Sequence, residues 1–247
     1  MVDTERLKFE AWQEALKARG LTFNIEDYIP LVGYSSEAIA DSIKELSGAT
    51  FNEKELILEK DTIYHTNQKP GVPVLDDAVS FLKDLINTKN RLNIKLALVS
   101  SAEHKEIKVN LERIGITAAD FDAVLSGKDD LKPLYGERDV NKPLPYIYQL
   151  CSEKLSIPPE NCLVFEDTNA GVLAAVGTGM AAIATQNDFT REHVFTGAIS
   201  KRSFKKMKIS EFVNEQPSSI STSLFSLLSN TKENPVGSEQ NQRDFFL

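Results

Sequence analysis

The chain has 247 residues and a formal net charge of −8. Its composition, 41% hydrophobic and 26% charged, is that of a globular protein with a sizeable core. The acidic balance and the lack of a basic stripe argue against a nucleic-acid partner. No apolar stretch approaches the ~20 residues of a membrane span, and the first twenty residues are charged throughout. We therefore expect no membrane partner and no signal peptide.

Two cysteines, Cys151 and Cys162, are too few for a disulfide framework in a chain of this size. They are typical of a protein kept in a reducing compartment. The cytoplasm is therefore the predicted location.

Helical periodicity dominates the beginning of the chain. Three amphipathic helices are expected, at residues 5–19, 36–46 and 52–65, and no strand pattern interrupts them. These helices carry apolar faces of their own. We therefore expect residues 1–13 to belong to the core and residues 14–70 to form an inserted all-α cap domain.

Strands and helices alternate from residue 71 to residue 213. Strands are expected at 94–99, 123–125, 162–165 and 180–184, and helices at 76–86, 103–114, 146–155 and 170–176. Such alternation predicts a parallel sheet covered on both faces, in an α/β core. Residues 214–247 are polar and Ser-rich, which predicts a disordered tail.

Two adjacent acids, Glu166 and Asp167, stand where the apolar run Cys162–Phe165 ends. The carboxyl ends of strands are where α/β sheets bind ligands, and hard carboxylate oxygens suit Mg²⁺. The alternative is a strand-to-helix turn in which Asp167 or Thr168 caps the next helix. Because a cap would explain one residue and not two adjacent acids, we predict a metal site.

Two other segments place polar residues near strand or helix ends. The strand at 94–99 ends in Ser100-Ser101, and Lys142-Pro143 precedes the helix at 146–155. By position alone, Ser100 is more simply a helix cap and Lys142 an ordinary surface lysine. The prolines after Lys142 restrict its backbone, which favours a fixed side chain.

The ordered series of strand–Ser, Lys-Pro and strand–Glu-Asp, with VDTERLKFEAW at residues 2–12, resembles the haloacid dehalogenase-like phosphohydrolases. Within them it is similar to the β-phosphoglucomutase-like and phosphatase subgroup, over about residues 2–200. The resemblance implies a Rossmann-like parallel sheet with an inserted all-α cap. It also implies Mg²⁺-dependent hydrolysis of a small phosphorylated metabolite, such as a sugar phosphate.

The resemblance assigns roles to individual residues. Ser100 and Ser101 would bind the phosphate, and Lys142 would place a catalytic positive charge beside it. Asp167, ahead of Glu166, would hold the Mg²⁺.

Residues of the cap and its surroundings bear on the substrate. Lys60 and Tyr64 match a Lys…Tyr pair that contacts substrate in some relatives, although a solvated i,i+4 pair explains them as well. The family's mutases carry a histidine where this chain has Lys8, an arginine at Ser36 and a lysine at Glu103. These departures weaken a second phosphate site, so a phosphatase-type hydrolase is favoured over a mutase.

The resemblance also implies a nucleophilic aspartate, in an Asp-x-Asp at the end of the first core strand. In relatives this motif comes just before the stretch that matches Val2–Glu5, so the first core strand is expected to be missing from residues 1–247. Asp120-Phe121-Asp122 does not replace it, because it precedes a strand and lies at the wrong edge of the sheet.

Several interpretations of this gap stay open. The sequence could be that of a phosphatase whose start has been placed too late or which is truncated, and whose residues 1–247 are inactive. It could instead be a catalytically dead relative that binds a ligand, or a phosphosugar mutase in its full-length form. An unrelated nucleotide-binding α/β protein is disfavoured, because no Gly-rich phosphate loop is present.

Overall fold

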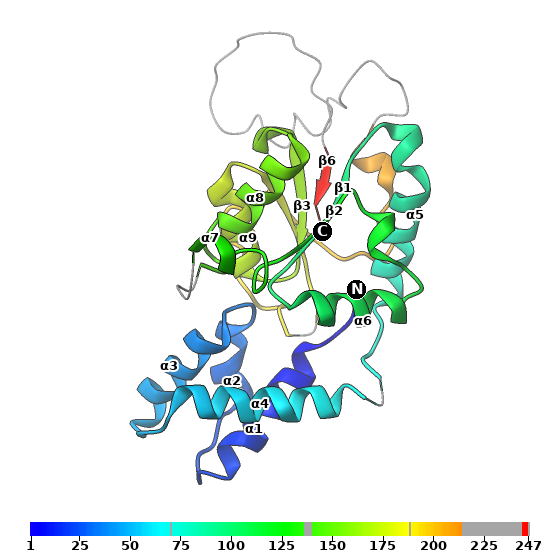
Figure 1. Cartoon of the computed structure of the whole chain (residues 1–247). Coiled ribbons are helices and arrows are strands. Elements are labelled where there is room, and N and C mark those ends of the chain that lie inside the picture. Colours follow the sequence, from blue (N-terminus) through cyan, green and yellow to red (C-terminus); the bar gives the residue numbers. More distant parts are fainter. Residues whose placement is uncertain (70, 136–139, 188, 214–243, 247) are drawn as a thin grey trace.

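The computed structural model describes residues 1–69, 71–135, 140–187, 189–213 and 244–246. A body of helices lies against one end of an α/β core (Figure 1). The expected α/β class, with a parallel sheet in its core, is confirmed.

The helical body is formed near the beginning of the chain, where helical periodicity was expected. Its helices are α1 (Glu5–Lys17), α2 (Ile25–Tyr28), α3 (Ser36–Ser47) and α4 (Glu53–Asn67). Asn52 caps α4, since its side-chain oxygen accepts a 3.4 Å hydrogen bond from the Glu55 N–H. Trp12, Leu16 and Leu56 belong to an apolar cluster that is separate from those of the sheet. The predicted boundary between residues 13 and 14 falls inside α1, and the division into domains stays a prediction.

A six-stranded sheet forms the core, and every pair of neighbouring strands in it is parallel. The strands are β1 (Leu96–Ser100), β2 (Ala123–Ser126), β3 (Cys162–Glu166), β4 (Ala181–Thr185), β5 (Ser200–Arg202) and β6 (Asp244–Phe246), in the order β2-β1-β6-β3-β4-β5. The sheet is covered by α5 (Asp76–Leu92), α6 (His104–Arg113), α7 (Lys132–Tyr135), α8 (Tyr146–Leu155) and α9 (Asn169–Thr178). Short 3₁₀ turns lie at Ile29–Leu31, Ala118–Asp120, Pro159–Asn161 and Ile209–Glu211.

Apolar side chains cover both faces of the sheet. One cluster joins strand residues to Tyr148 of α8 and Val172 of α9, and the other joins them to Leu82 of α5 and Leu111 of α6. A parallel sheet must be covered in this way, which explains why its strands are continuous apolar runs in the sequence.

The position between β1 and β3 departs from expectation. We expected a first core strand to be missing there and a disordered tail from residue 214. Residues 214–243 and 247 lie outside the described residues, but Asp244–Phe246 form β6, which pairs with both β1 and β3. A short stretch of the polar segment is therefore part of the sheet, because the backbone groups of two buried strands require partners.

Two connections join the helical body to the core, and they run side by side. Val2 forms an antiparallel bridge with Val74, and the Asp3 N–H donates a 2.8 Å hydrogen bond to the Pro73 carbonyl. Within the described part of the chain, no helix has the length and apolar character needed to cross a membrane.

Candidate active site

A cleft of about 580 Å³ lies between the helical body and the carboxyl edge of the sheet. The core lines it with Ser100 and Ser101 after β1, with Lys142, and with Glu166 and Asp167 at the end of β3. The helical body adds Lys60 and Tyr64 of α4, among other residues. Residues distant in sequence that we predicted as site residues thus line one cleft.

Lys142 and Glu166 form a buried ion pair at the floor of the cleft, with side chains that are 8% and 7% exposed. The Lys142 Nζ also donates a 3.2 Å hydrogen bond to the Val99 carbonyl, and it lies 5.0 Å from the ring centre of Tyr148. The Tyr148 hydroxyl donates to the same Glu166 oxygen as Lys142. Lys142 is therefore a fixed cation and not an ordinary surface lysine.

Tyr148 and Gly171 take part in this network although neither was singled out in the sequence. Burial and the negative charge of Glu166 raise the pKa of Tyr148, so its hydroxyl stays protonated and donates. A Cβ at Gly171 would lie 2.0 Å from the Glu166 Oε2, so this position must be glycine for the carboxylate to lie there. The small-residue pattern of the helix was the available signal for Gly171. Nothing in the sequence marked Tyr148.

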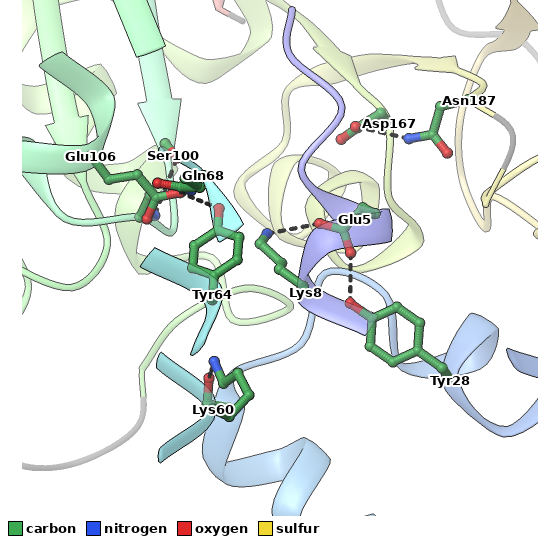
Figure 2. Close-up of polar contacts among 12 residues, drawn as sticks. Glu5, Lys8, Tyr28, Lys60, Tyr64, Gln68, Ser100, Glu106, Asp167 and Asn187 are labelled. Carbon is green, nitrogen blue, oxygen red and sulfur yellow. Dashed lines mark hydrogen bonds and ion pairs between the residues drawn. The ribbon is translucent and has the colours of Figure 1, made fainter. Parts of the chain in front are cut away.

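Asp167 opens to the cleft, where it accepts a 3.2 Å hydrogen bond from the Asn187 side-chain amide (Figure 2). The protein around its side chain, together with the nearby charge of Glu166, raises the pKa of Asp167. The capping alternative applies to Thr168, whose Oγ1 accepts a 3.0 Å hydrogen bond from the Gly171 N–H. Capping therefore involves the next residue and leaves Asp167 facing the cleft.

The predicted metal ligands differ in how well they suit Mg²⁺. Asp167 presents carboxylate oxygens to the cleft, as a Mg²⁺ ligand would, whereas the Lys142 and Tyr148 side chains already bind Glu166. Across the described residues, no three His, Cys, Asp or Glu side chains are grouped as a metal site. The donor set fits an ion that takes one protein carboxylate and completes its shell with water and phosphate.

Ser100 ends β1 at the cleft. Its Oγ accepts a 3.1 Å hydrogen bond from the Ala102 N–H, and its carbonyl accepts a 2.7 Å bond from the Gly127 N–H. Because α6 begins at His104 and its N-cap is Glu103, Ser100 shapes the turn after the strand and does not cap the helix. The neighbouring Ser101 is exposed and lines the same cleft.

Lys60 and Tyr64 are not a solvated pair, since they are 5% and 4% exposed. The Lys60 Nζ lies 2.9 Å from the Ser36 Oγ, 2.6 Å from an Asp61 carboxylate oxygen and 5.0 Å from the ring centre of Trp12. Burial lowers the pKa of Lys60, and the charge of Asp61 opposes this shift. Lys60 is thus held by the helical body at the wall of the cleft.

Tyr64 joins the helical body to the core. Its hydroxyl donates a 2.6 Å hydrogen bond to Glu106 of α6, which also accepts a 3.4 Å bond from Gln68 (Figure 2). Burial and the charge of Glu106 raise the pKa of Tyr64, against the opposing effect of Lys8. Glu106 carried no sequence signal, because its partner lies 42 residues away in the chain.

Glu5 organises the first turn of α1, which also lines the cleft. It accepts a 2.7 Å bond from the Lys8 Nζ and a 2.9 Å bond from the Tyr28 hydroxyl (Figure 2). Burial acts to lower the pKa of Lys8, but the charges of Glu5 and Glu106 raise it by more, so Lys8 stays a cation. Lys8 therefore places a fixed positive charge at the position where the family's mutases carry a histidine.

The Asp-x-Asp at Asp120-Phe121-Asp122 has structural contacts at the edge of the sheet opposite the cleft, where β1 and β2 begin. Asp120 accepts from the Thr117 N–H at 2.7 Å, and Asp122 accepts from the Leu96 N–H at 3.0 Å. These contacts hold the turn before β2 against the first residue of β1.

Comparison with known proteins places the chain in a family. The sequence profile of the haloacid dehalogenase-like hydrolases matches residues 1–185. The chain is 29% identical to the fructose-1-phosphate phosphatase YqaB of Escherichia coli over 183 residues, which is 74% of this chain and 89% of the relative. It is 28% identical to a phosphorylated carbohydrates phosphatase of Thermotoga maritima, over 74% of this chain and 79% of the relative.

Solved structures share the fold. A β-phosphoglucomutase from Clostridium difficile matches with a TM-score of 0.64 and 20% identity, over 85% of this chain and 90% of that one. A CbbY variant from Rhodobacter sphaeroides, in complex with xylulose-(1,5)bisphosphate, matches with a TM-score of 0.63 and 23% identity, over 83% and 91%. Together with the sequence match, the fold and the series of residues at the carboxyl edge of its sheet show that this chain belongs to the haloacid dehalogenase-like hydrolases.

Proposed function

We propose that the protein is a phosphatase-type hydrolase that cleaves a small phosphate monoester, of which a sugar phosphate is the favoured class, with Mg²⁺. The observation that carries this proposal is the convergence of Ser100, Lys142 and Asp167 on one cleft at the carboxyl edge of the sheet. Phosphoryl transfer requires mainly positioning and charge stabilisation, which these groups supply. The names of the relatives, a fructose-1-phosphate phosphatase and a phosphorylated carbohydrates phosphatase, support the substrate class.

Each residue has a role in this proposal. Ser100 and Ser101 would donate their hydroxyls to phosphate oxygens, and Lys142 would balance the charge that spreads over them in the transition state. Glu166, with Tyr148, positions Lys142. Asp167 would hold Mg²⁺, which neutralises phosphate charge when bound.

The helical body would act as a cap. Lys60 and Tyr64 form its wall of the cleft, so they would contact the part of the substrate that is not phosphate. Closure of such a body over a substrate excludes water from the reaction. Lys8 adds a permanent cation to the same wall, which favours a substrate with polar or anionic groups beyond the phosphate.

The nucleophile decides the activity of residues 1–247. In this family a strand-end aspartate attacks the phosphorus, the alcohol leaves, and water then hydrolyses the aspartyl-phosphate. Between β1 and β3, the described strand is β6, whose Asp244 pairs with Cys162 at the edge opposite the cleft. No described aspartate ends a strand at that position, so we propose that the polypeptide 1–247 binds phosphate esters without hydrolysing them.

A phosphate-release assay tests the proposal. Residues 1–247 are compared with the same chain joined to an N-terminal apolar strand that ends in Asp-x-Asp, over a panel of sugar phosphates with Mg²⁺ or with EDTA. We expect Mg²⁺-dependent turnover only in the joined form. In that form Lys142→Ala should lower kcat/KM by ~10²-fold or more, whereas Lys154→Ala, on the exposed side of α8, should not change it.

Two results would contradict the proposal. Mg²⁺-dependent turnover by residues 1–247 would show that another group is the nucleophile. A joined form that folds, melts cooperatively and hydrolyses none of the esters would favour the ligand-binding alternative. Titration of sugar phosphates into residues 1–247 then measures whether the cleft binds them. The cytoplasm stays our prediction for the location.

A further inference from the structure

The connection between β4 and β5 contacts both the helical body and the candidate site. It runs from Thr185, the last residue of β4, to Ser200, the first residue of β5. Asn187 in this connection lines the cleft, whereas Phe189 is 4% exposed and belongs to the apolar cluster of the helical body. Two residues that are close in the sequence therefore join the wall of the site to the interior of the helical body.

Phe189 is held in the helical body by aromatic and cationic contacts. Its ring lies edge-on to the ring of Tyr28, with 6.4 Å between the ring centres, and the Arg6 guanidinium carbon lies 5.7 Å from its centre. Tyr28 belongs to α2 and Arg6 to α1. His193, farther along the connection, donates a 2.7 Å hydrogen bond from Nε2 to the Ile29 carbonyl. The helical body therefore fixes where this connection lies.

The side-chain amide of Asn187 has a defined orientation. Its Oδ1 accepts a 2.9 Å hydrogen bond from the Phe189 N–H and a 3.0 Å bond from the Thr190 N–H. Because the oxygen is bonded to the backbone of the turn, the Nδ2 is the atom that faces Asp167. It donates a 3.2 Å hydrogen bond to the Asp167 Oδ2 (Figure 2). The turn that begins at Asn187 thus helps to determine how the Asp167 carboxylate is directed.

We propose that Asn187 is a positioning residue for Mg²⁺ binding at Asp167, and that Phe189 sets the position of Asn187 from within the helical body. The amide holds one oxygen of the carboxylate and leaves the other for the ion. Hydrogen-bond partners of metal ligands tune metal affinity by about 10–100-fold. This inference rests on the role of Asp167 in the proposed function.

The same contacts couple the helical body to the ion. The docked helical body holds Phe189 and with it Asn187, which directs the carboxylate of Asp167. Because coupling between two sites is reciprocal, Mg²⁺ should in turn stabilise the docked connection. The Phe189 and Thr190 N–H groups report on this effect, since their bonds to Asn187 must open before they exchange with solvent.

A titration of residues 1–247 with Mg²⁺, followed by the thermal shift, measures the Kd of the ion. Asn187→Ser keeps an oxygen that can accept in the turn but is too short to reach Asp167. It should raise the Kd about tenfold or more. Asn169→Ser is the matched control, because the Asn169 Oδ1 accepts a 3.0 Å bond from the Thr196 N–H and ties α9 to the same connection. It should leave the Kd unchanged.

Phe189→Leu tests the contact with the helical body. It should raise the Kd about fivefold or more. This effect should vanish in an Asn187→Ser background, because Phe189 acts through Asn187. Phe23→Leu is the matched control, since Phe23 is also 4% exposed and its ring also lies edge-on to that of Tyr28, at 6.0 Å. Both leucine variants should lower the Tm without Mg²⁺, but only Phe189→Leu should weaken binding of the ion.

Hydrogen exchange gives a second measurement. With Mg²⁺, the amides of residues 189 and 190 should exchange more slowly in the parent protein and at an unchanged rate in Asn187→Ser. A Kd that Asn187→Ser leaves unchanged or lowers would overturn the inference, since the amide would then be irrelevant to the ion or compete with it. Equal effects of Phe189→Leu and Phe23→Leu on the Kd would overturn the role of Phe189.

The measured affinities separate this inference from the proposed function. A joined form that hydrolyses no phosphate ester would count against the proposed function alone, because the Kd of the ion is measured without turnover. Turnover by the joined form, together with a Kd that does not depend on Asn187, would overturn the inference alone. A parent protein whose Tm does not respond to Mg²⁺ would also overturn it.

Discussion

Gly171 lies directly beneath the carboxylate of Glu166, so close that a Cβ on residue 171 would be 2.0 Å from the Oε2. The glycine is in the first turns of α9, and the acid is the last residue of β3. This close approach allows Glu166 to lie against the helix and to hold Lys142. The position of the catalytic lysine we propose therefore depends on a residue without a side chain.

Gly171→Ala should destabilise the protein despite the higher helix propensity of alanine. The methyl group displaces Glu166 and overpacks the site, at a cost of about 1–3 kcal/mol. Gly177→Ala is the matched control on the same helix, since its Cβ would meet Pro145 at an ordinary 3.7 Å. Thermal denaturation should show a lower Tm for the first variant and an unchanged or higher Tm for the second. Equal effects would mean that Glu166 moves aside without cost.

The buried pair of Lys142 and Glu166 should behave as a coupled unit. Lys142→Met or Glu166→Gln alone leaves an uncompensated buried charge, and each should cost about 3–5 kcal/mol in the free energy of unfolding. The double variant should lose much less than the sum of the two. A double-mutant cycle by urea denaturation measures this coupling. Additive losses would show that the two side chains are independent.

Tyr64→Phe should loosen the contact between α4 and α6. It removes the 2.6 Å hydrogen bond to Glu106, and bonds to a charged group are worth about 1.5–3 kcal/mol. Hydrogen exchange should quicken in α4 and near Glu106, while β3 is unaffected. Tyr34→Phe, on a tyrosine that is 37% exposed, serves as the control. If α4 exchanges at the original rate, other contacts hold the helical body in place.

Asp122 should make stability depend on pH. Burial acts to raise the pKa of Asp122, but the Leu96 N–H and the ammonium groups of Lys89 and Lys95 lower it by more. A carboxylate whose pKa is lower in the folded state stabilises the fold above its unfolded pKa of about 3.9, and this contribution is lost as the pH falls through the folded value.

Asp122→Asn should therefore be less stable than the parent protein between about pH 5 and 8, and the gap should close below about pH 4. Denaturant unfolding at a series of pH values measures it. Asp41→Asn, on the exposed side of α3, is the control and should show no such convergence. If Asp122→Asn is still less stable than the parent protein at low pH, its loss of stability comes from packing and not from the charge of Asp122.

Asp167→Asn should abolish the thermal shift that Mg²⁺ produces. At ten times its Kd, an ion that binds only the folded state adds about 1.4 kcal/mol of stability. Glu37→Gln removes an acid from the cleft wall on α3 and should leave the shift intact. A shift that survives Asp167→Asn would place the ion elsewhere.

Local sequence patterns determined most of the elements. The helix at 146–155 was predicted with the bounds that α8 has, and the strand at 162–165 differs from β3 by one residue. Such elements depend on periodicity, capping residues and apolar runs, which are properties of neighbouring residues. The shared sheet edge of Ser100 and Asp167 followed from strand ends, because parallel strands release their carboxyl ends on one side. The place of Lys142 beside them was expected only from the family resemblance.

Tertiary packing decided what the local pattern left open. Lys60 could have been solvated, and it is buried against Trp12 because α1 and α4 pack against each other there. Glu166 was expected at the metal, whereas its described contacts are with Lys142 and Tyr148. Both outcomes depend on partners far away in the chain, which no local window contains.

Residues 214–247 show most clearly what could not be predicted from the sequence. Their composition predicted disorder, because a polar segment buries too little apolar surface to offset the entropy of ordering. Asp244–Phe246 nevertheless form a strand between β1 and β3. The sequence by itself determined the alternating helices and strands and the edge at which the site lies. Only the tertiary structure decided which segment fills the centre of the sheet, since that choice depends on the unmet hydrogen bonds of two strands that are distant in sequence.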